Sequence, residues 1–593
     1  AGSSFGQRLA AGWILPLVAL AGAGVYFSRP SPPSVSETDP TRPLPEVRPA
    51  LTHVGKQFDP VLSPDGQHVA FAWQGPGEGD YDSTSDYDLW LQQIDSNEPV
   101  QLTDHGDEER LPAWAPDGLS LVYARYSPAG QTCGLYRIAV IGGSPNRFAD
   151  CPRNLRSIDA SPDGQSLVLS VTEAPGEPWG VFRLDLETGD RHRLTQPPEG
   201  SLGDYHPAVS PDGRWIAFGR RSNDFRHDVM VAAADGTGAR SLTDDPWGQV
   251  RGLEWSADSR SVLYSSNRAG RFVLWRANLE GGEPERLPIL DDWIVQPSLD
   301  RSGQRLIYRT FRDVVDLYAL PLIAPGQAVG EPERVLASTR SERDPLVSPD
   351  GTTIAFLSDR SGTLELWTGS VTGDQLLQRT DLAGPRPESP AWSPDGESLV
   401  FDTAVDGHAD LWRLEADSQR PERLTADPGN ERNATFSRDG SAIYFTSDRG
   451  GAWNIYSMPA DGGPARQITR DGAFLAIESA DGSALFLSRP DQPGIWRQSL
   501  AGGEPERLID DLSLIDWGSW VVGRDGIYYL RRNPTEIAFR PFDRDEPSSV
   551  YQPPKQMPYL ARNLSLAPDG QTLLFAMIDR SDNEVIRVDW GGF

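Results

Sequence analysis

The sequence predicts an all-β protein made of two consecutive six-bladed β-propellers that follow one N-terminal transmembrane helix. Three observations predict this fold. A four-stranded unit recurs along the chain, a break rich in proline and glycine lies near mid-chain, and one long apolar segment lies near the start. The chain has 593 residues, which is too long for one ordinary hydrophobic core and agrees with at least two domains.

The clearest repeated element is the tetrapeptide Ser-Pro-Asp-Gly or a near form of it. Its acidic position recurs at spacings of 42 to 52 residues, with Ser302 in that place in one copy. Each copy precedes apolar residues such as Ile354, Ala355 and Phe356, which are typical of a strand. The other anchors are Asp65, Asp117, Asp163, Asp212, Asp258, Asp350, Asp395, Asp439, Asp481, Asp525 and Asp569. Because the aspartate recurs in all but one of the units, we interpret it as a turn-forming residue rather than a functional one.

Two further turns follow in each unit. Residues 358–362 form a Ser-Asp-Arg-Ser-Gly loop, residues 461–463 form an Asp-Gly-Gly turn, and a last strand ends in Leu-Thr, as at 424–425. Proline fixes φ at a turn corner, and glycine accepts positive φ. The unit is therefore four antiparallel strands joined by three hairpins, which is the pattern of a propeller blade.

The blades must close into rings, because no blade buries both faces of its sheet alone. Twelve blades exceed the usual range of about four to eight in one ring. We expect a first propeller at 48–322, a linker at 323–332 and a second propeller at 333–593, while a seven-plus-five division stays open. Leu51–Thr52 and 335–337 are outer strands without a blade of their own, and we expect them to close the first and second rings.

The N-terminal region predicts a membrane anchor. Residues 9–27 are apolar throughout and nearly long enough, as a helix, to cross a hydrocarbon core of about 30 Å. The alternative is a cleaved signal peptide, since 19–21 has a small-x-small pattern. Residues 1–8 form a short flank and 28–47 a Pro-rich tether. The chain begins with Ala1 instead of Met, and we expect a cytoplasmic domain upstream.

The charge of the chain excludes some classes of partner. Arg8 and Arg29 are the only charged residues in 1–29, so the other 564 residues carry a net charge of −32. Such a surface repels phosphate backbones and anionic lipids, and we expect no nucleic-acid contact by the propellers. The sequence shows no catalytic triad, no metal-ligand spacing and no cofactor motif, so we expect no enzyme, metal site or cofactor.

The two cysteines predict a disulfide. Cys133 opens the third strand of the second blade, Cys151 follows its fourth strand, and the turn at 142–143 lies midway between them. Folding this hairpin brings the two residues within one position of direct opposition, so a slight bulge allows the bond. The alternative is two reduced thiols that pack as small apolar side chains.

The candidate binding residues lie at the starts of the innermost strands, where a propeller channel opens. Four arginines among them predict a local positive rim that attracts an acidic peptide or a small anion. The alternative is that they cap strand ends and pair with neighbouring aspartates. The candidates are Arg110, His206, Arg251, Arg343, Glu388 and Arg432.

The repeated motifs also carry a family resemblance. The Ser-Pro-Asp-Gly anchor, the Ser-Asp-Arg loop and the Asp-Gly-Gly turn resemble the TolB-type, WD40-like repeat over residues 48–593. The order of helix, Pro-rich tether and long propeller with a cysteine pair is similar to CadC-like transmembrane regulators, which join a cytoplasmic winged-helix domain to an exported sensor.

These resemblances imply a function for the exported part. We expect a sensory or protein-interaction module in the periplasm, anchored in the bacterial inner membrane, with a protein or peptide ligand at a propeller face. DNA would be contacted only by an upstream winged-helix domain. The alternatives are a TolB-like envelope scaffold that only binds, and an enzyme with its active site in a propeller funnel.

Overall fold

The computed structural model describes residues 45–593, apart from 54–56, 76–86, 128–131, 291–292, 560–561, 591–593 and the single positions 153, 175, 224, 246, 383 and 533. The predicted flank, helix and most of the tether, at 1–44, lie outside the described residues. Within the described ranges, no helix has the length and apolar character needed to cross a membrane.

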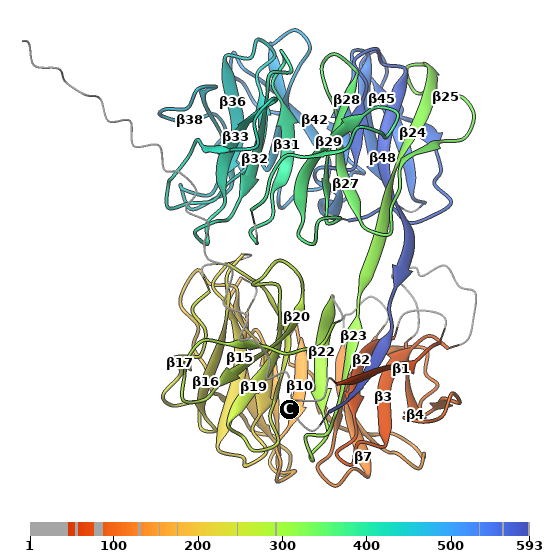
Figure 1. Ribbon diagram of the computed structural model, residues 1–593, viewed down its shortest axis with the longest axis vertical. Helices are drawn as coiled ribbons and strands as arrows, with labels where there is room; N and C mark the ends of the chain where they lie inside the picture. Colours follow the sequence, from red (N-terminus) through yellow and green to blue (C-terminus); the bar gives the residue numbers. More distant parts are fainter. Residues whose placement is uncertain are drawn as a thin grey trace, which may run out of the picture.

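The described chain confirms the prediction of an all-β protein. It forms twelve antiparallel sheets, each of four strands except one that has five, and a short 3₁₀ helix, η2 (Leu514–Asp516). Figure 1 shows two stacked bodies, with β1 (Glu46–Leu51) and the C-terminal end of the chain in the same body.

The first propeller has six blades, and its innermost strands contact one another in a closed ring through β2, β6, β10, β14, β18 and β22. Its first five blades are β2 (Phe58–Leu62), β3 (His68–Trp73), β4 (Asp88–Gln93), β5 (Val100–Gln101); β6 (Glu108–Trp114), β7 (Ser120–Tyr126), β8 (Cys133–Ala139), β9 (Asn146–Asp150); β10 (Ser157–Ala160), β11 (Ser166–Val171), β12 (Gly180–Asp185), β13 (Arg191–Arg193); β14 (Gly203–Val209), β15 (Trp215–Arg221), β16 (His227–Ala233), β17 (Arg240–Ser241); and β18 (Val250–Trp255), β19 (Ser261–Ser266), β20 (Val273–Asn278), β21 (Glu285–Arg286). The sixth blade is β22 (Ile294–Leu299), β23 (Arg305–Thr310), β49 (Val585–Asp589) and β1.

The second propeller also has six blades. Most neighbouring innermost strands contact directly, and its fourth and fifth blades share a core that includes Phe486 and Tyr529. Its first five blades are β27 (Glu342–Val347), β28 (Thr353–Ser358), β29 (Glu365–Ser370), β30 (Leu377–Gln378); β31 (Glu388–Trp392), β32 (Ser398–Thr403), β33 (Asp410–Glu415), β34 (Glu422–Arg423); β35 (Glu431–Phe436), β36 (Ala442–Ser447), β37 (Asn454–Pro459), β38 (Arg466–Gln467); β39 (Leu475–Glu478), β40 (Ala484–Ser488), β41 (Ile495–Ser499), β42 (Glu506–Ile509); and β43 (Trp520–Val522), β44 (Gly526–Arg531), β45 (Glu536–Pro541), β46 (Ser548–Tyr551). The sixth blade is β47 (Leu564–Leu566), β48 (Thr572–Asp582), β24 (Arg312–Ala324), β25 (Gln327–Ala328) and β26 (Glu333–Leu336).

The two propellers are not consecutive along the chain, and this corrects the predicted boundaries. Strand β24, expected in the first propeller, pairs with β48 in the second, where Leu317 lies opposite Ala576. Strand β49, expected in the second propeller, pairs with β23 in the first, where Tyr308 lies opposite Ile586. The third strands of the two sixth blades are therefore exchanged, and Figure 1 shows β24 and β48 spanning the two bodies.

The predicted linker at 323–332 is wrong for a related reason, because it is largely part of the sixth blade of the second propeller. The end of β24 folds back on β25, and β26 pairs with β24. The closing strands occupy the expected rings. Strand β1 completes the first propeller by pairing with β49, and β26 completes the second.

Neither crossing contains glycine or proline. In the other blades a loop rich in glycine or polar residues follows the second strand, but only Phe311 separates β23 from β24. The corresponding segment 576–584 contains neither glycine nor proline, although it does contain Asp, Ser and Asn, which favour turns. At both crossings the chain continues without a hairpin into the other propeller.

The recurrent aspartate is a turn former, as the sequence predicted. In the first blade, Ser63 donates a hydrogen bond of 2.5 Å to Asp65 Oδ1, which also accepts the Gln67 N–H at 3.0 Å. Gly66 has φ +70°, a conformation that glycine adopts without steric cost. The hydrogen bond from Ser63 lowers the pKa of Asp65, so the carboxylate that closes the turn stays ionised.

The Leu-Thr ends of the outer strands have a comparable role. The hydroxyl of Thr380, which follows an arginine in place of the leucine, accepts the N–H of Leu366 at 2.9 Å and donates to Glu365 at 2.6 Å. Thr425 makes the same pair of contacts with Leu411 and Asp410. The threonine therefore holds the outer strand where the regular ladder has ended.

The same end of each propeller faces the other propeller. Asn223 of the first propeller donates a hydrogen bond of 2.8 Å to the carbonyl of Gly407 in the second. The guanidinium carbon of Arg432 lies 5.0 Å from the centre of the Phe225 ring. These loops lie at the ends where the innermost strands begin, so the two channel mouths open toward each other.

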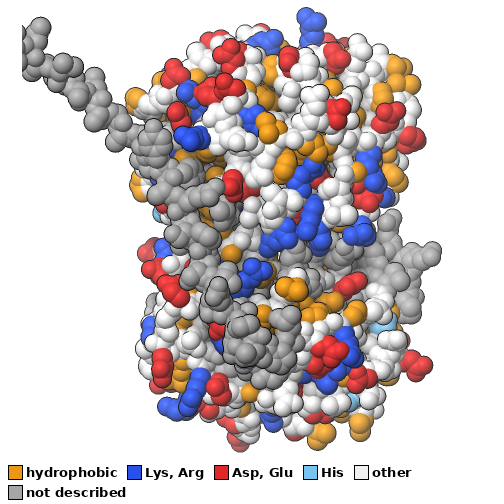
Figure 2. Space-filling model, in the orientation of Figure 1, with side chains coloured by type: hydrophobic (Ala, Val, Ile, Leu, Met, Phe, Trp, Pro, Cys, Tyr) orange, Lys and Arg blue, Asp and Glu red, His pale blue; other side chains and the backbone are white. Residues whose placement is uncertain are grey.

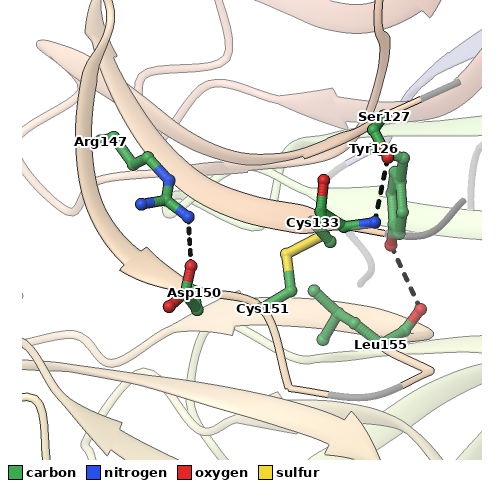
Figure 3. Close-up of a disulfide and its surroundings, with 8 residues drawn as sticks. Tyr126, Ser127, Cys133, Arg147, Asp150, Cys151 and Leu155 are labelled. Carbon is green, nitrogen blue, oxygen red and sulfur yellow. Dashed lines mark hydrogen bonds and ion pairs between the residues drawn. A yellow bond between two sulfur atoms is a disulfide. The ribbon is translucent and has the colours of Figure 1, made fainter.

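The disulfide between Cys133 and Cys151 is present (Figure 3). The Cα atoms lie 5.1 Å apart, and the N–H of Cys151 donates to the carbonyl of Cys133 at 3.0 Å. A register shift between Leu135 and Tyr136 supplies the predicted bulge and brings the cysteines opposite each other. The bond joins the start of β8 to the chain that leaves β9.

We predict that Ile586→Ala destabilises the first propeller although the residue lies near the C-terminus. Ile586 is 6 % exposed and packs in a core with Leu306 and Tyr308, and such a truncation costs about 2–5 kcal/mol. Leu317→Ala, the matched variant from mid-chain, should destabilise the second propeller. Hydrogen–deuterium exchange should increase in β22 and β23 for the first variant and in β47 and β48 for the second. The reverse pattern would contradict the exchange.

The disulfide should contribute to stability through loop closure. Its cysteines are 18 positions apart, and the chain-entropy model assigns about 3 kcal/mol to a loop of this size. We expect the melting temperature of the C133S/C151S variant to be lower than that of the oxidised wild type. Adding a reductant should leave the melting temperature of the variant unchanged. Calorimetry with and without a phosphine reductant checks this, and equal melting of oxidised and reduced wild type would count against it.

Candidate functional site

The predicted channel-mouth residues share a backbone feature that the sequence did not reveal. Most innermost strands contain a bulge whose residue has positive φ, six positions before the acidic position of the anchor. Asparagine, aspartate and glycine tolerate this conformation best, and a bulge turns the preceding side chain out of the regular strand alternation. The bulge residues are Asp59, Leu111, His206, Gly252, Gln296, Asp344, Ser389 and Asn433.

Five of the six predicted residues occupy one equivalent position, directly before the bulge residue. These five are Arg110, Arg251, Arg343, Glu388 and Arg432. His206 is itself a bulge residue, one position further along. The six candidates divide between the two mouths, with three in each propeller, so the structure does not bring them into one cluster.

Buried acids, which the sequence analysis missed, fix the starts of these strands. Glu342 is fully buried and accepts a hydrogen bond of 2.8 Å from Arg360. Glu109 pairs in the same way with Arg125, at 2.6 Å. In both pairs the arginine lies at or just after the end of the second strand. Arg360 belongs to a complete Ser-Asp-Arg loop, whereas Arg125 does not. Pairing of the arginine with the acid before the bulge holds the strand start in place.

On one side of the first mouth, the cation is neutralised. Asp59 Oδ2 accepts a hydrogen bond from Arg110 at 2.9 Å, and Asp59 Oδ1 accepts one from Gln296 at 2.9 Å. Burial raises the pKa of Asp59, but attraction to Arg110 and these hydrogen bonds outweigh it and leave the pKa below its ordinary value. This arrangement agrees with the alternative in which a rim arginine pairs with a neighbouring aspartate.

The second mouth is also paired. Glu388 accepts a hydrogen bond from Arg432. It also forms an ion pair with Arg386, in which Nε of the arginine lies 2.6 Å from Oε1 of the glutamate. Burial opposes the charge of Glu388, but the two guanidinium groups lower its pKa. In the sixth blade of the same propeller, burial lowers the pKa of Arg562 to about 10. The predicted local positive rim is therefore neutralised at Arg110 and Arg432 by neighbouring carboxylates.

Two of the predicted arginines have no side-chain ion pair among the described residues, although Arg343 lies close enough to attract the carboxylate of Asp344. Arg251 donates to the side chain of Gln249 at 3.1 Å and lies 5.7 Å over the Phe272 ring. Arg343 has a half-buried side chain, and its Nε has no hydrogen-bond partner within the described part of the chain. Figure 2 shows Lys and Arg side chains gathered near the level at which the two propellers meet.

Two half-buried acids lie further along the innermost strands of the first propeller. Burial and the nearby Asp159 raise the pKa of Glu254 to about 8. Burial raises the pKa of Asp159 to about 6, although it accepts the N–H of Val209 at 2.8 Å. Glu254 is therefore protonated at neutral pH. Within the described ranges, no three His, Cys, Asp or Glu side chains are grouped so that they could hold a metal ion.

Comparison with known protein families shows to which family the chain belongs. The model of the TolB beta propeller domain matches residues 48–252, 181–385 and 384–520, which together cover most of the sequence. The chain belongs to the TolB beta propeller domain family.

Individual relatives match less of this TolB-family chain. The Tol-Pal system protein TolB of Anaeromyxobacter dehalogenans (strain 2CP-C) is 37 % identical over 130 residues, which are 21 % of this chain and 28 % of that protein. The chain thus matches little more than a quarter of that relative's length.

Some solved structures are similar to this chain, with low TM-scores and low sequence identity. TolB from Acinetobacter baumannii is 16 % identical, with a TM-score of 0.28 over 59 % of this chain and 79 % of that one. The oligogalacturonate lyase from Vibrio parahaemolyticus is 14 % identical, with a TM-score of 0.32 over 63 % and 97 %.

The raised pKa of Glu254 predicts how the stability of this TolB-family propeller depends on pH. A carboxyl whose pKa is raised in the folded state binds a proton that the unfolded chain has released, so stability falls as pH rises from about 4.5 toward 8. Glu254→Gln cannot ionise, and it should melt above the wild type at pH 9, by about 2–4 °C for each kcal/mol gained. At pH 5 the two proteins should melt together.

The matched control is Glu280→Gln, which removes an exposed carboxylate from the same blade. Its melting temperature should follow the wild type at both pH values. An advantage of Glu254→Gln that is equal at pH 5 and pH 9 would show that the carboxyl does not titrate in this range.

Proposed function

We propose that the protein is a binding protein of the bacterial envelope, which holds a polypeptide ligand at the two facing channel mouths. The observation that carries this proposal is the mouth-to-mouth packing of two propellers whose rims bear charged side chains. Such rims offer hydrogen bonds and charge to a ligand, and the low-dielectric walls around them strengthen both. The family assignment supports a binding role, since one relative is named as a protein of the Tol-Pal system.

The location is part of the proposal. A disulfide between Cys133 and Cys151 is favoured in an oxidising compartment, which supports export to the periplasm. Anchoring in the inner membrane by residues 9–27 stays a prediction from the sequence. So does coupling to a cytoplasmic winged-helix domain, by which the propellers would act as a sensor for transcription. The binding role needs neither of them.

Site-specific photocrosslinking tests the proposal. In one variant, a photoreactive benzoylphenylalanine replaces Gln249, which lines the first mouth. In the control variant it replaces Ala239, which is exposed between β16 and β17, at the end of the fourth blade opposite to the mouth. We expect irradiation of the source bacterium to yield a covalent adduct with one polypeptide from position 249 and none from position 239. Adducts from both positions alike, or from neither, would argue against a ligand at the mouth.

A further inference from the structure

A pocket of about 110 Å³ lies at the first channel mouth, between the fourth and fifth blades. Its lining combines two arginines, two histidines and a glutamine, and it includes no carboxylate. We name it the blade 4–5 pocket. Its lining residues are Tyr205, His206, Gly219, Arg221, His227, Gln249, Val250 and Arg251.

The pocket lies at the position equivalent to the one where the first and second blades form an ion pair. Arg110 occupies the position before the bulge in the second blade, and it pairs with Asp59, the bulge residue of the blade before it. Arg251 occupies the same position in the fifth blade, and the bulge residue of the blade before it is His206. The fifth blade therefore has the same cation as the second blade, but faces an imidazole where Arg110 faces a carboxylate.

His227 presents an unused donor in the same pocket. It is 5 % exposed, and its Nδ1 accepts the N–H of Val250 at 3.1 Å, which assigns the proton to Nε2. Nε2 is buried and has no hydrogen-bond partner among the described residues. Leaving a buried donor unsatisfied is unfavourable, and an acceptor in the pocket would relieve this.

The electrostatics of the pocket favour an anion. Desolvation, with repulsion from Arg251 and Arg221, lowers the pKa of His206 to about 4. The same causes hold the pKa of His227 well below its ordinary value. Arg251 is exposed at the pocket edge, yet partial desolvation and repulsion from Arg221 and Arg386 lower its pKa. Both imidazoles are neutral at pH 7, and the arginines supply the positive charge.

We propose that the blade 4–5 pocket binds a single oxyanion group, a carboxylate or a phosphate, between the Arg251 guanidinium and the Nε2–H of His227. The volume suits one such group. The group belongs either to a free anion or to an acidic side chain or C-terminus of a peptide. In the second case the inference rests on the proposed function and gives the chemistry of one anchor of the ligand.

The direct test is a titration followed by NMR of the histidine rings. The protein has seven histidines, so selective ¹⁵N labelling gives a small set of signals. Acetate, inorganic phosphate and a short acidic peptide are added separately at pH 7. We expect the Nε2 resonance of His227 to shift in a saturable way, because its N–H gains an acceptor.

Two variants identify the residues responsible. Arg251→Gln removes an exposed charge, and loss of a charge-assisted hydrogen bond should weaken binding by about tenfold or more. His206→Asp rebuilds the carboxylate found beside Arg110, and it should weaken anion binding to a similar degree while the fold is kept. Arg260→Gln, which changes an exposed arginine in the turn at the other end of the fifth blade, should bind as the wild type does.

The outcomes separate this inference from the proposed function. Saturable binding of acetate or phosphate that Arg251→Gln weakens supports a site for a free anion. Binding of the peptide alone, weakened by the same variant, supports the peptide as the source. Peptide binding that neither Arg251→Gln nor His206→Asp changes would overturn the pocket and leave the proposed function standing. No saturable shift with any probe would overturn the pocket as well.

Discussion

The exchange of third strands between the two sixth blades is the constraint on which the rest of the structure depends. Each propeller keeps the two inner strands of its sixth blade and receives the third strand from the segment that crosses from the other propeller. The two crossings, β23 to β24 and β48 to β49, lie side by side (Figure 1). They fix the propellers with their channel mouths opposed, which places the candidate residues of both rings at one junction.

Burial outweighs the entropic cost of this arrangement. Pairing β1 with β49 joins Val47 and Val588, and a loop about ten times as long as one repeat adds about 2 kcal/mol to the cost of closure. Val585 and Val588 are fully buried and Ile586 nearly so, and each contributes roughly 1.5–3 kcal/mol. The long sequence separation between β1 and β49 is expected to slow folding more than it lowers stability, because the first propeller cannot close before the last strand is made.

Local chemistry made the blades predictable, and long-range pairing made their connection unpredictable. The Asp65 turn and the bulge beside Cys133 follow from residues near one another in the repeat. The exchange instead depends on pairings between strands far apart in the chain, β24 with β48 and β49 with β23. Absence of a turn is a weak signal in a sequence of degenerate repeats, and period alone cannot tell which of two similar blades receives a strand.

The candidate site was predictable in position but not in charge, for a related physical reason. A fixed spacing from the anchor locates the bulge in most blades, so Arg110 and Arg251 can be placed equivalently from the sequence. Whether each arginine is neutralised depends on the bulge residue of the preceding blade, which is Asp59 in one case and His206 in the other. One side chain at a repeated backbone position thus changes the electrostatics while every strand pairing is kept. A repeat fold can acquire a specific site in this way without any departure from the blade geometry, which explains why motif spacing alone does not reveal it.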